Sequence, residues 1–121
     1  MSPRILVIED QEDNRRILRD LLTSAGYEVI EAVTGDEGVT MAETQRPDLI
    51  LMDIQLPDLD GYEATRRIKA NPALRQIPII VVTSYALSGD DIKAHEAGCD
   101  AYIAKPFSPR ILLAKVREYV P

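Results

Sequence analysis

The feature that most constrains the fold is a short apolar run over residues 49–52, which leads directly into the carboxylate of Asp53. Pro47 precedes this run and Pro57 soon follows it, so a helix is disfavoured there. A continuous apolar run of this length favours a strand buried on both faces, as in a parallel sheet. In open α/β sheets, ligands bind just outside the carboxyl ends of the strands. Asp53 is therefore either a reactive group or the cap of the loop that follows.

Strand-like and helix-like segments alternate along the rest of the chain. The other predicted strands are residues 5–8, 27–32, 77–83 and 101–104, and the predicted helices are residues 14–25, 35–45, 62–70, 88–98 and 109 onward. This alternation, with short connections, predicts a mostly parallel sheet with helices on both faces. We expect a flavodoxin-like, doubly wound α/β fold with five helices and five strands in the order 2-1-3-4-5.

The helical patterns also predict which side chains face the core. In the first helix, the inward stripe comprises Ile17, Leu18, Leu21, Leu22 and Ala25, and in the last helix it comprises Ile111, Leu112, Val116 and Tyr119. Arg15 and Arg16 are expected on a solvated face of the first helix, or alternatively in contact with a partner protein. Gly26 is expected to end the first helix, and Ser108 is expected to cap the last one ahead of Pro109.

Length and composition indicate a single domain and argue against a nucleic-acid-binding, membrane or secreted protein. The 121 residues suit one domain, residues 1–121, with a single ordinary core. The formal net charge of −6 argues against direct binding of nucleic acid or of an anionic membrane. No apolar run is long enough to insert into a membrane, and no signal peptide is evident. With Cys99 as the only cysteine, no disulfide can form within the chain, and we expect a cytoplasmic location.

Charged and polar residues gather at the ends of the predicted strands. Glu9 and Asp10 follow the first strand, Asp53 ends the third, Thr83 ends the fourth and Lys105 follows the fifth. In the expected strand order the first and third strands are neighbours, so the three carboxylates should share one crevice. Their mutual repulsion requires positive charge, which Lys105 and a divalent cation can supply. Carboxylate oxygens with waters suit Mg²⁺.

These residue types form a set that can transfer a phosphoryl group. Asp53 can attack phosphorus as a carboxylate nucleophile and become an aspartyl phosphate. A magnesium ion can neutralise charge that develops on the phosphoryl oxygens, and Lys105 and Thr83 can hold the remaining oxygens.

Several ordered motifs together resemble the receiver domains of two-component response regulators. These motifs are residues 8–10, residues 51–53 with Pro57 and residues 60–61, residues 82–83, and residues 101–107. The resemblance spans essentially the whole chain. Within the family, residues 52–57 and 98–103 most resemble single-domain cell-division regulators of the DivK type.

The resemblance implies a function and a set of roles. Asp53 would accept a phosphoryl group from a phosphohistidine of a histidine kinase or a histidine phosphotransfer protein. Glu9, Asp10, Asp53 and the backbone carbonyl of Gln55 would surround Mg²⁺. Thr83 and Tyr102 would form a switch pair, and Lys105–Pro106 would be a cis peptide. The signal would then pass to a downstream target protein through the fourth helix, fifth strand and fifth helix.

Three other functions fit these residues less well. A phosphatase or mutase that uses an aspartyl phosphate would need a second aspartate two residues after the nucleophile, where this chain has Gln55. A flavin binder would need a loop that cradles phosphate after the first strand, and the acidic residues 9–13 would repel a phosphate. A receiver-like module that binds partners without phosphorylation is disfavoured because every site residue is present. We therefore expect a phosphoacceptor signalling domain and not an enzyme.

Overall fold

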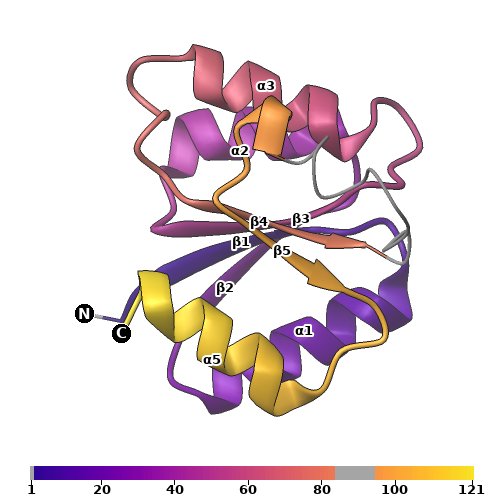
Figure 1. Cartoon of the computed structure of the whole chain (residues 1–121), viewed down its shortest axis with the longest axis vertical. Coiled ribbons are helices and arrows are strands. Elements are labelled where there is room, and N and C mark those ends of the chain that lie inside the picture. Colours follow the sequence, from indigo (N-terminus) through magenta and orange to yellow (C-terminus); the bar gives the residue numbers. More distant parts are fainter. Residues whose placement is uncertain (1, 84–94) are drawn as a thin grey trace.

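A computed structural model of the protein describes residues 2–83 and 95–121 (Figure 1). Five parallel strands form one sheet in the order β2-β1-β3-β4-β5, as predicted. The strands are β1 (Arg4–Ile8), β2 (Glu28–Ala32), β3 (Leu49–Asp53), β4 (Ile79–Thr83) and β5 (Ala101–Ala104). The helices are α1 (Glu12–Ser24), α2 (Gly35–Gln45), α3 (Gly61–Ala70) and α5 (Pro109–Tyr119). Residues 95–97 are helical, Gly98 follows them in a turn, and residues 88–94 of the predicted helix lie outside the described residues.

Helices cover both faces of the sheet. Figure 1 shows α1 and α5 against one face and α2 and α3 against the other. Successive side chains of a strand point to opposite faces, so Val7 packs with the α1 and α5 layer while Leu6 packs with the α2 and α3 layer. All five residues of β3 are buried, which confirms that the apolar run before Asp53 is the central strand.

Local sequence signals account for several helix ends. The side chains of Thr34, Asp60 and Ser108 each accept a hydrogen bond from the backbone N–H three residues on, so α2, α3 and α5 are capped as such residues usually cap helices. Pro109 occupies the first turn of α5. Gly26 ends α1 in a left-handed conformation, with φ of +97°, that residues with a Cβ rarely adopt.

Some details of the sequence prediction are wrong, among them the start of β4 at Ile79 instead of residue 77. Helix α1 begins at Glu12, two residues earlier than the apolar pattern indicated. Ile17 and Ile111 do not face the core, since 51% and 60% of their surfaces are exposed. In each helix the neighbouring residue, Leu18 or Leu112, occupies the centre of the buried stripe. A residue one position earlier is rotated about 100° around the helix, which carries its side chain out of the buried stripe.

In residues 2–83 and 95–121, the helices are all too short or too polar to cross a membrane.

Candidate active site

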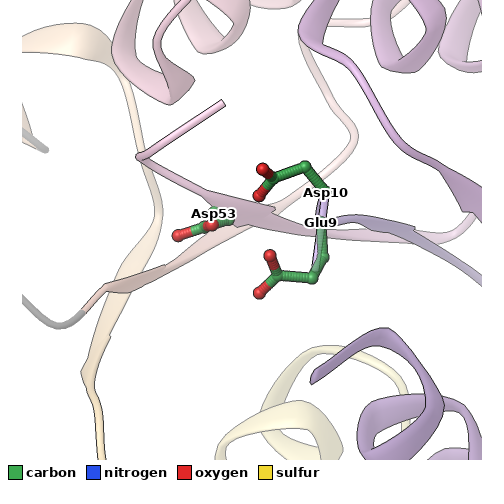
Figure 2. A group of neighbouring side chains, drawn as sticks. All are labelled: Glu9, Asp10 and Asp53. Atoms are coloured by element: carbon green, nitrogen blue, oxygen red, sulfur yellow. The ribbon is translucent and has the colours of Figure 1, made fainter. Parts of the chain in front are cut away.

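Three carboxylates meet at the carboxyl ends of β1 and β3. The strands pair with Ile8 opposite Met52, so the turn after β1 lies beside the last residue of β3. One carboxylate oxygen from each of Glu9, Asp10 and Asp53 lies within 4.8 Å of the others. Figure 2 shows that Glu9 and Asp10 leave the same turn in different directions while both reach toward Asp53. The predicted acidic crevice is therefore present.

Lys105 supplies positive charge to this cluster. Its ammonium nitrogen lies 2.9 Å from a carboxylate oxygen of Glu9 and 3.6 Å from one of Asp53. Lys105 follows β5, and its backbone N–H donates to the carbonyl of Thr83 at 2.7 Å, which fixes the start of its loop. The lysine and the two carboxylates come from three strand ends, and only the folded sheet brings them together.

The pKa values of Asp53 and Glu9 are shifted in opposite directions. Burial and, after it, the negative charge of Glu9 raise the pKa of Asp53 to about 6, although Lys105 opposes the rise. Burial also acts to raise the pKa of Glu9. There, however, hydrogen bonds from Lys105 and from the backbone N–H of Gln11 outweigh burial, so the pKa of Glu9 lies below its ordinary value. Glu9 therefore stays ionised while Asp53 holds its negative charge less strongly.

The donor set fits a hard divalent cation. With all three carboxylates ionised and Lys105 protonated, the four groups carry a net charge of −2, from three negative charges and one positive charge. Oxygen ligands from two or three carboxylates, with waters completing the shell, match the coordination that Mg²⁺ prefers. The charge and the ligand type of this cluster therefore suit a divalent metal ion.

A small cavity opens onto Asp10 and Asp53. Its volume is about 250 Å³, and it is lined by Asp10, Gln11, Asn14, Asp53, Gln55 and Lys105. Since a water molecule takes about 30 Å³ in the liquid, the cavity has room for several small groups at once. Gln55 is exposed at this cavity, beside Asp53. The acceptor oxygens of Asp53 are therefore reachable from solvent even though its side chain is only 8% exposed.

The remaining residues singled out from the sequence lie on β4, β5 and the turn after β5. Thr83 is fully buried at the end of β4 and pairs with Ala104. Tyr102 is half-buried on β5, where it pairs with Val81 and packs against a small apolar cluster. The Lys105–Pro106 peptide is cis, as the resemblance implied.

The loop between β3 and α3 is held by a contact that no pattern in the sequence predicts. The carboxylate of Asp58 accepts hydrogen bonds from the backbone N–H groups of Gly35 and Asp36, at 2.7 and 2.8 Å. These are the first two residues of α2, so Asp58 caps a helix that precedes it by more than twenty residues. At the other end of the loop, the backbone of Gly61 packs against the carbonyl of Asp53 with no room for a Cβ.

Arg15 is not on a solvated helix face, which corrects one of the two expectations for it. Its side chain is only 17% exposed and pairs with Glu31 of β2. Its guanidinium also donates to the backbone carbonyls of Glu9 and Asp10. Arg16 does lie in solvent, with a side chain that is 58% exposed. The adjacent residues Arg15 and Arg16 therefore lie in two different environments.

Comparison with known proteins identifies the family. Residues 5–117 match the response regulator receiver domain. The chain is 42% identical over 120 residues to the polar-differentiation response regulator DivK of Brucella anthropi, across 99% of this chain and 98% of that protein. The chain belongs to the response regulator receiver family. It is therefore a phosphoacceptor signalling domain of two-component systems, as its motifs indicated.

Solved structures agree with this assignment. A putative response regulator from Chloroflexus aurantiacus has a TM-score of 0.95 at 31% identity, over 99% of this chain and 98% of that chain. The receiver domain of a sensor histidine kinase from Pseudomonas aeruginosa has a TM-score of 0.92 at 41% identity, with the same shares covered. That second structure holds a magnesium ion coordinated in its active-site cleft.

Proposed function

We propose that residues 1–121 form one phosphoacceptor domain in which Asp53 is the residue that receives the phosphoryl group. The observation that carries this proposal is the placement of a buried carboxylate at the end of the central strand, beside Lys105 and two further acids. In the transfer, a carboxylate oxygen of Asp53 forms a bond to phosphorus. The bond from phosphorus to the donor's histidine nitrogen breaks, and the electron pair of that bond stays with the imidazole. The domain promotes this one transfer and the slow hydrolysis that resets it, and it turns over no separate substrate.

We propose that Glu9, Asp10, Asp53 and the backbone carbonyl of Gln55 hold Mg²⁺, which would neutralise charge on the phosphoryl oxygens. The magnesium in the cleft of the related receiver domain supports this assignment. Lys105 then has two partners in succession. In the free domain its ammonium pairs with Glu9 and Asp53, and after transfer it can donate to a phosphoryl oxygen.

The phosphodonor is proposed to be a histidine kinase or a histidine phosphotransfer protein that docks on an apolar groove beside the site. This groove has a volume of about 410 Å³ and lies between α1 and the turn after β5. Ile17 and Phe107 line it, and it shares Asn14 and Lys105 with the acidic cavity. A partner bound in this groove would lie next to Asp53, and the exposed Ile17 would then contact that partner.

Thr83 and Tyr102 are proposed to carry the signal to a target protein. A phosphoryl group on Asp53 offers strong acceptor oxygens to the Thr83 hydroxyl at the end of the neighbouring strand. Movement of that hydroxyl changes the space available to the Tyr102 ring on β5, which alters the surface near α5. Two states that differ by a few kcal/mol suffice for such a switch.

The proposal is tested by labelling with acetyl phosphate in the presence of Mg²⁺. Wild-type protein should gain one base-labile phosphoryl group, and Asp53→Asn should gain none while keeping its fold. Asp20→Asn is a matched control, because Asp20 is an aspartate on α1 whose side chain is 72% exposed. Undiminished labelling of Asp53→Asn would refute the assignment.

The docking groove is tested separately, by transfer from a phosphorylated histidine protein. Ile17→Asp should slow transfer from the protein donor at least tenfold while leaving labelling by acetyl phosphate unchanged. Ile111→Asp is the control, because Ile111 is equally apolar and exposed but does not line the groove. Equal effects of the two substitutions on transfer would place docking elsewhere.

A further inference from the structure

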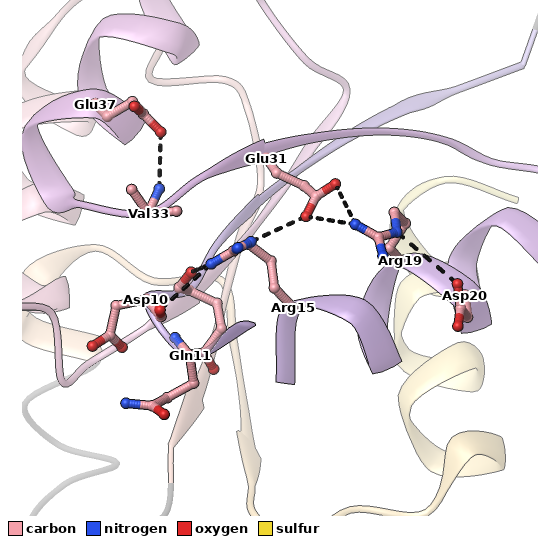
Figure 3. Close-up of polar contacts among 9 residues, drawn as sticks. Asp10, Gln11, Arg15, Arg19, Asp20, Glu31, Val33 and Glu37 are labelled. Carbon is pink, nitrogen blue, oxygen red and sulfur yellow. Dashed lines mark hydrogen bonds and ion pairs between the residues drawn. The ribbon is translucent and has the colours of Figure 1, made fainter. Parts of the chain in front are cut away.

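The turn that carries Glu9 and Asp10 is bound to the edge of the sheet by one guanidinium group. Nη1 of Arg15 donates to the backbone carbonyl of Glu9 at 3.1 Å and to that of Asp10 at 3.4 Å. Nε of the same side chain donates to Glu31 of β2 at 3.1 Å. Figure 3 shows the guanidinium between the Glu31 carboxylate and the turn.

Glu31 is itself held in place. Arg19, one helical turn after Arg15, donates to both of its carboxylate oxygens at 3.1 and 3.3 Å. The side chain of Glu31 is 26% exposed, so its carboxylate is partly shielded from water as well as doubly paired. Hydrogen bonds between ionised groups of this kind are stronger than neutral ones and favour a fixed geometry. Arg15 is thus anchored at one end and binds the turn with the other.

Two consecutive carbonyls that point at one nitrogen fix the peptide planes on both sides of Asp10. These planes determine the direction in which the side chains of Glu9 and Asp10 leave the chain. The turn also needs such a restraint, because three carboxylates that repel one another lie within 4.8 Å. We propose that Arg15, oriented by Glu31, is a positioning residue that sets the geometry of the magnesium ligands Glu9 and Asp10. This inference rests on the proposed function, because it takes those two acids as ligands.

Charge and geometry predict opposite results when Arg15 is replaced. Loss of a positive charge near an acidic site should by itself strengthen binding of a divalent cation. Loss of an outer-shell partner that orients ligands should weaken binding, typically on the order of 10- to 100-fold. The sign of the change in Mg²⁺ affinity therefore separates the two explanations.

The experiment is a calorimetric titration of Mg²⁺ into each protein at fixed ionic strength. We expect Arg15→Met to raise the dissociation constant about tenfold or more. Arg15→Lys should show a similar loss, since an ammonium keeps the charge but cannot reproduce the fork between Glu31 and two carbonyls. Arg16→Met is the matched control, because Arg16 is the adjacent arginine and its side chain contacts Asp13 in solvent. It should change affinity less than twofold or tighten binding slightly.

Glu31→Gln gives a second, milder route to the same test. It leaves Arg15 able to bind the turn but weakens the anchor, so we expect a smaller rise in the dissociation constant. Combining Glu31→Gln with Arg15→Met should add little beyond Arg15→Met alone, because both act through one contact. Unchanged or tighter Mg²⁺ binding in Arg15→Met, or full retention of affinity in Arg15→Lys, would overturn the proposal.

A readout without metal distinguishes failure of this inference from failure of the proposed function. The backbone N–H of Gln11 donates to the carboxylate of Glu9 at 3.1 Å, so its amide chemical shift reports the geometry of the turn. Arg15→Met should move this amide in the metal-free protein, and Arg16→Met should leave it in place. If the wild type bound no Mg²⁺, the ligand assignment would fail. If the Gln11 amide were also unmoved, the positioning role would fail as well.

Discussion

Replacing Asp53 with asparagine should stabilise the metal-free protein at neutral pH. Burial raises the pKa of Asp53 from its ordinary value of 3.8 to about 6. The unfolded chain keeps the ordinary value, so between about pH 4 and pH 6 the folded state binds more protons than the unfolded state. The free energy of unfolding of the wild type must then fall as pH rises through this window. The side chain of Asp53→Asn carries no charge, so the free energy of unfolding of this variant should not fall in the same way.

The size of the effect follows from the two pKa values. At about 1.36 kcal/mol per pKa unit, a rise from 3.8 to about 6 corresponds to roughly 3 kcal/mol above pH 7. About half of this difference should be present at pH 5, and little of it should remain at pH 4. The magnitude is a large share of the stability of an ordinary domain, which is on the order of 5–15 kcal/mol.

The assay is urea unfolding of both proteins in EDTA at pH 4, 5 and 7.5. We expect the free energy of unfolding of Asp53→Asn to exceed that of the wild type by an amount that increases with pH. Added Mg²⁺ should reduce this difference, because it stabilises the wild type more strongly. Asp20→Asn removes an exposed carboxylate, so its gap should stay near zero throughout. A gap that does not change with pH, or an Asp53→Asn protein less stable than wild type at pH 7.5, would refute the reasoning.

Three further substitutions test other parts of the structure. Asp58→Ala should lower the free energy of unfolding, measured in urea, by about 1 kcal/mol, because α2 loses its distant cap. An unchanged midpoint of the urea transition would show that water replaces the cap without loss of stability. Gly61→Ala should cost about 1–3 kcal/mol in the same assay, since a Cβ there would lie 2.9 Å from the Cα of Ile54; wild-type stability would show that the loop yields freely. Thr83→Ala should still be labelled by acetyl phosphate, but the amide shifts of residues 101–104 should no longer respond to beryllofluoride, and a full wild-type response would argue against Thr83 and Tyr102 as the switch pair.

Much of the candidate site could be predicted because it depends on strand ends. The apolar run before Asp53 predicts a buried strand, so Asp53 is expected at the carboxyl end of that strand. The alternation of strands and helices predicts which strand ends are neighbours. Glu9, Asp10 and Lys105 follow from the same reasoning, since each comes directly after its own strand. The caps at Ser108 and Gly26 could also be predicted, because a cap acts on the helix next to it.

Residues whose surroundings come from distant segments could not be predicted in this way. Ile17 fits the apolar period of its helix, yet it is exposed and faces a groove formed partly by Phe107. Arg15 and Arg16 are the same residue type side by side, and only the position of Glu31 on β2 distinguishes them. Burial raises the pKa of the Cys99 thiol to about 11, which keeps it protonated.

The sequence by itself therefore determined the order of the sheet, the carboxylate at its centre and the residue types around it, because these follow from patterns along the chain. Tertiary structure alone decided the ionisation of Asp53, the use of Arg15 to hold the turn, and the capping of α2 by Asp58. The physical reason is that burial, charge pairing and capping across 22 or 23 residues depend on the distances between segments. Those distances exist only once the helices have packed on the two faces of the sheet.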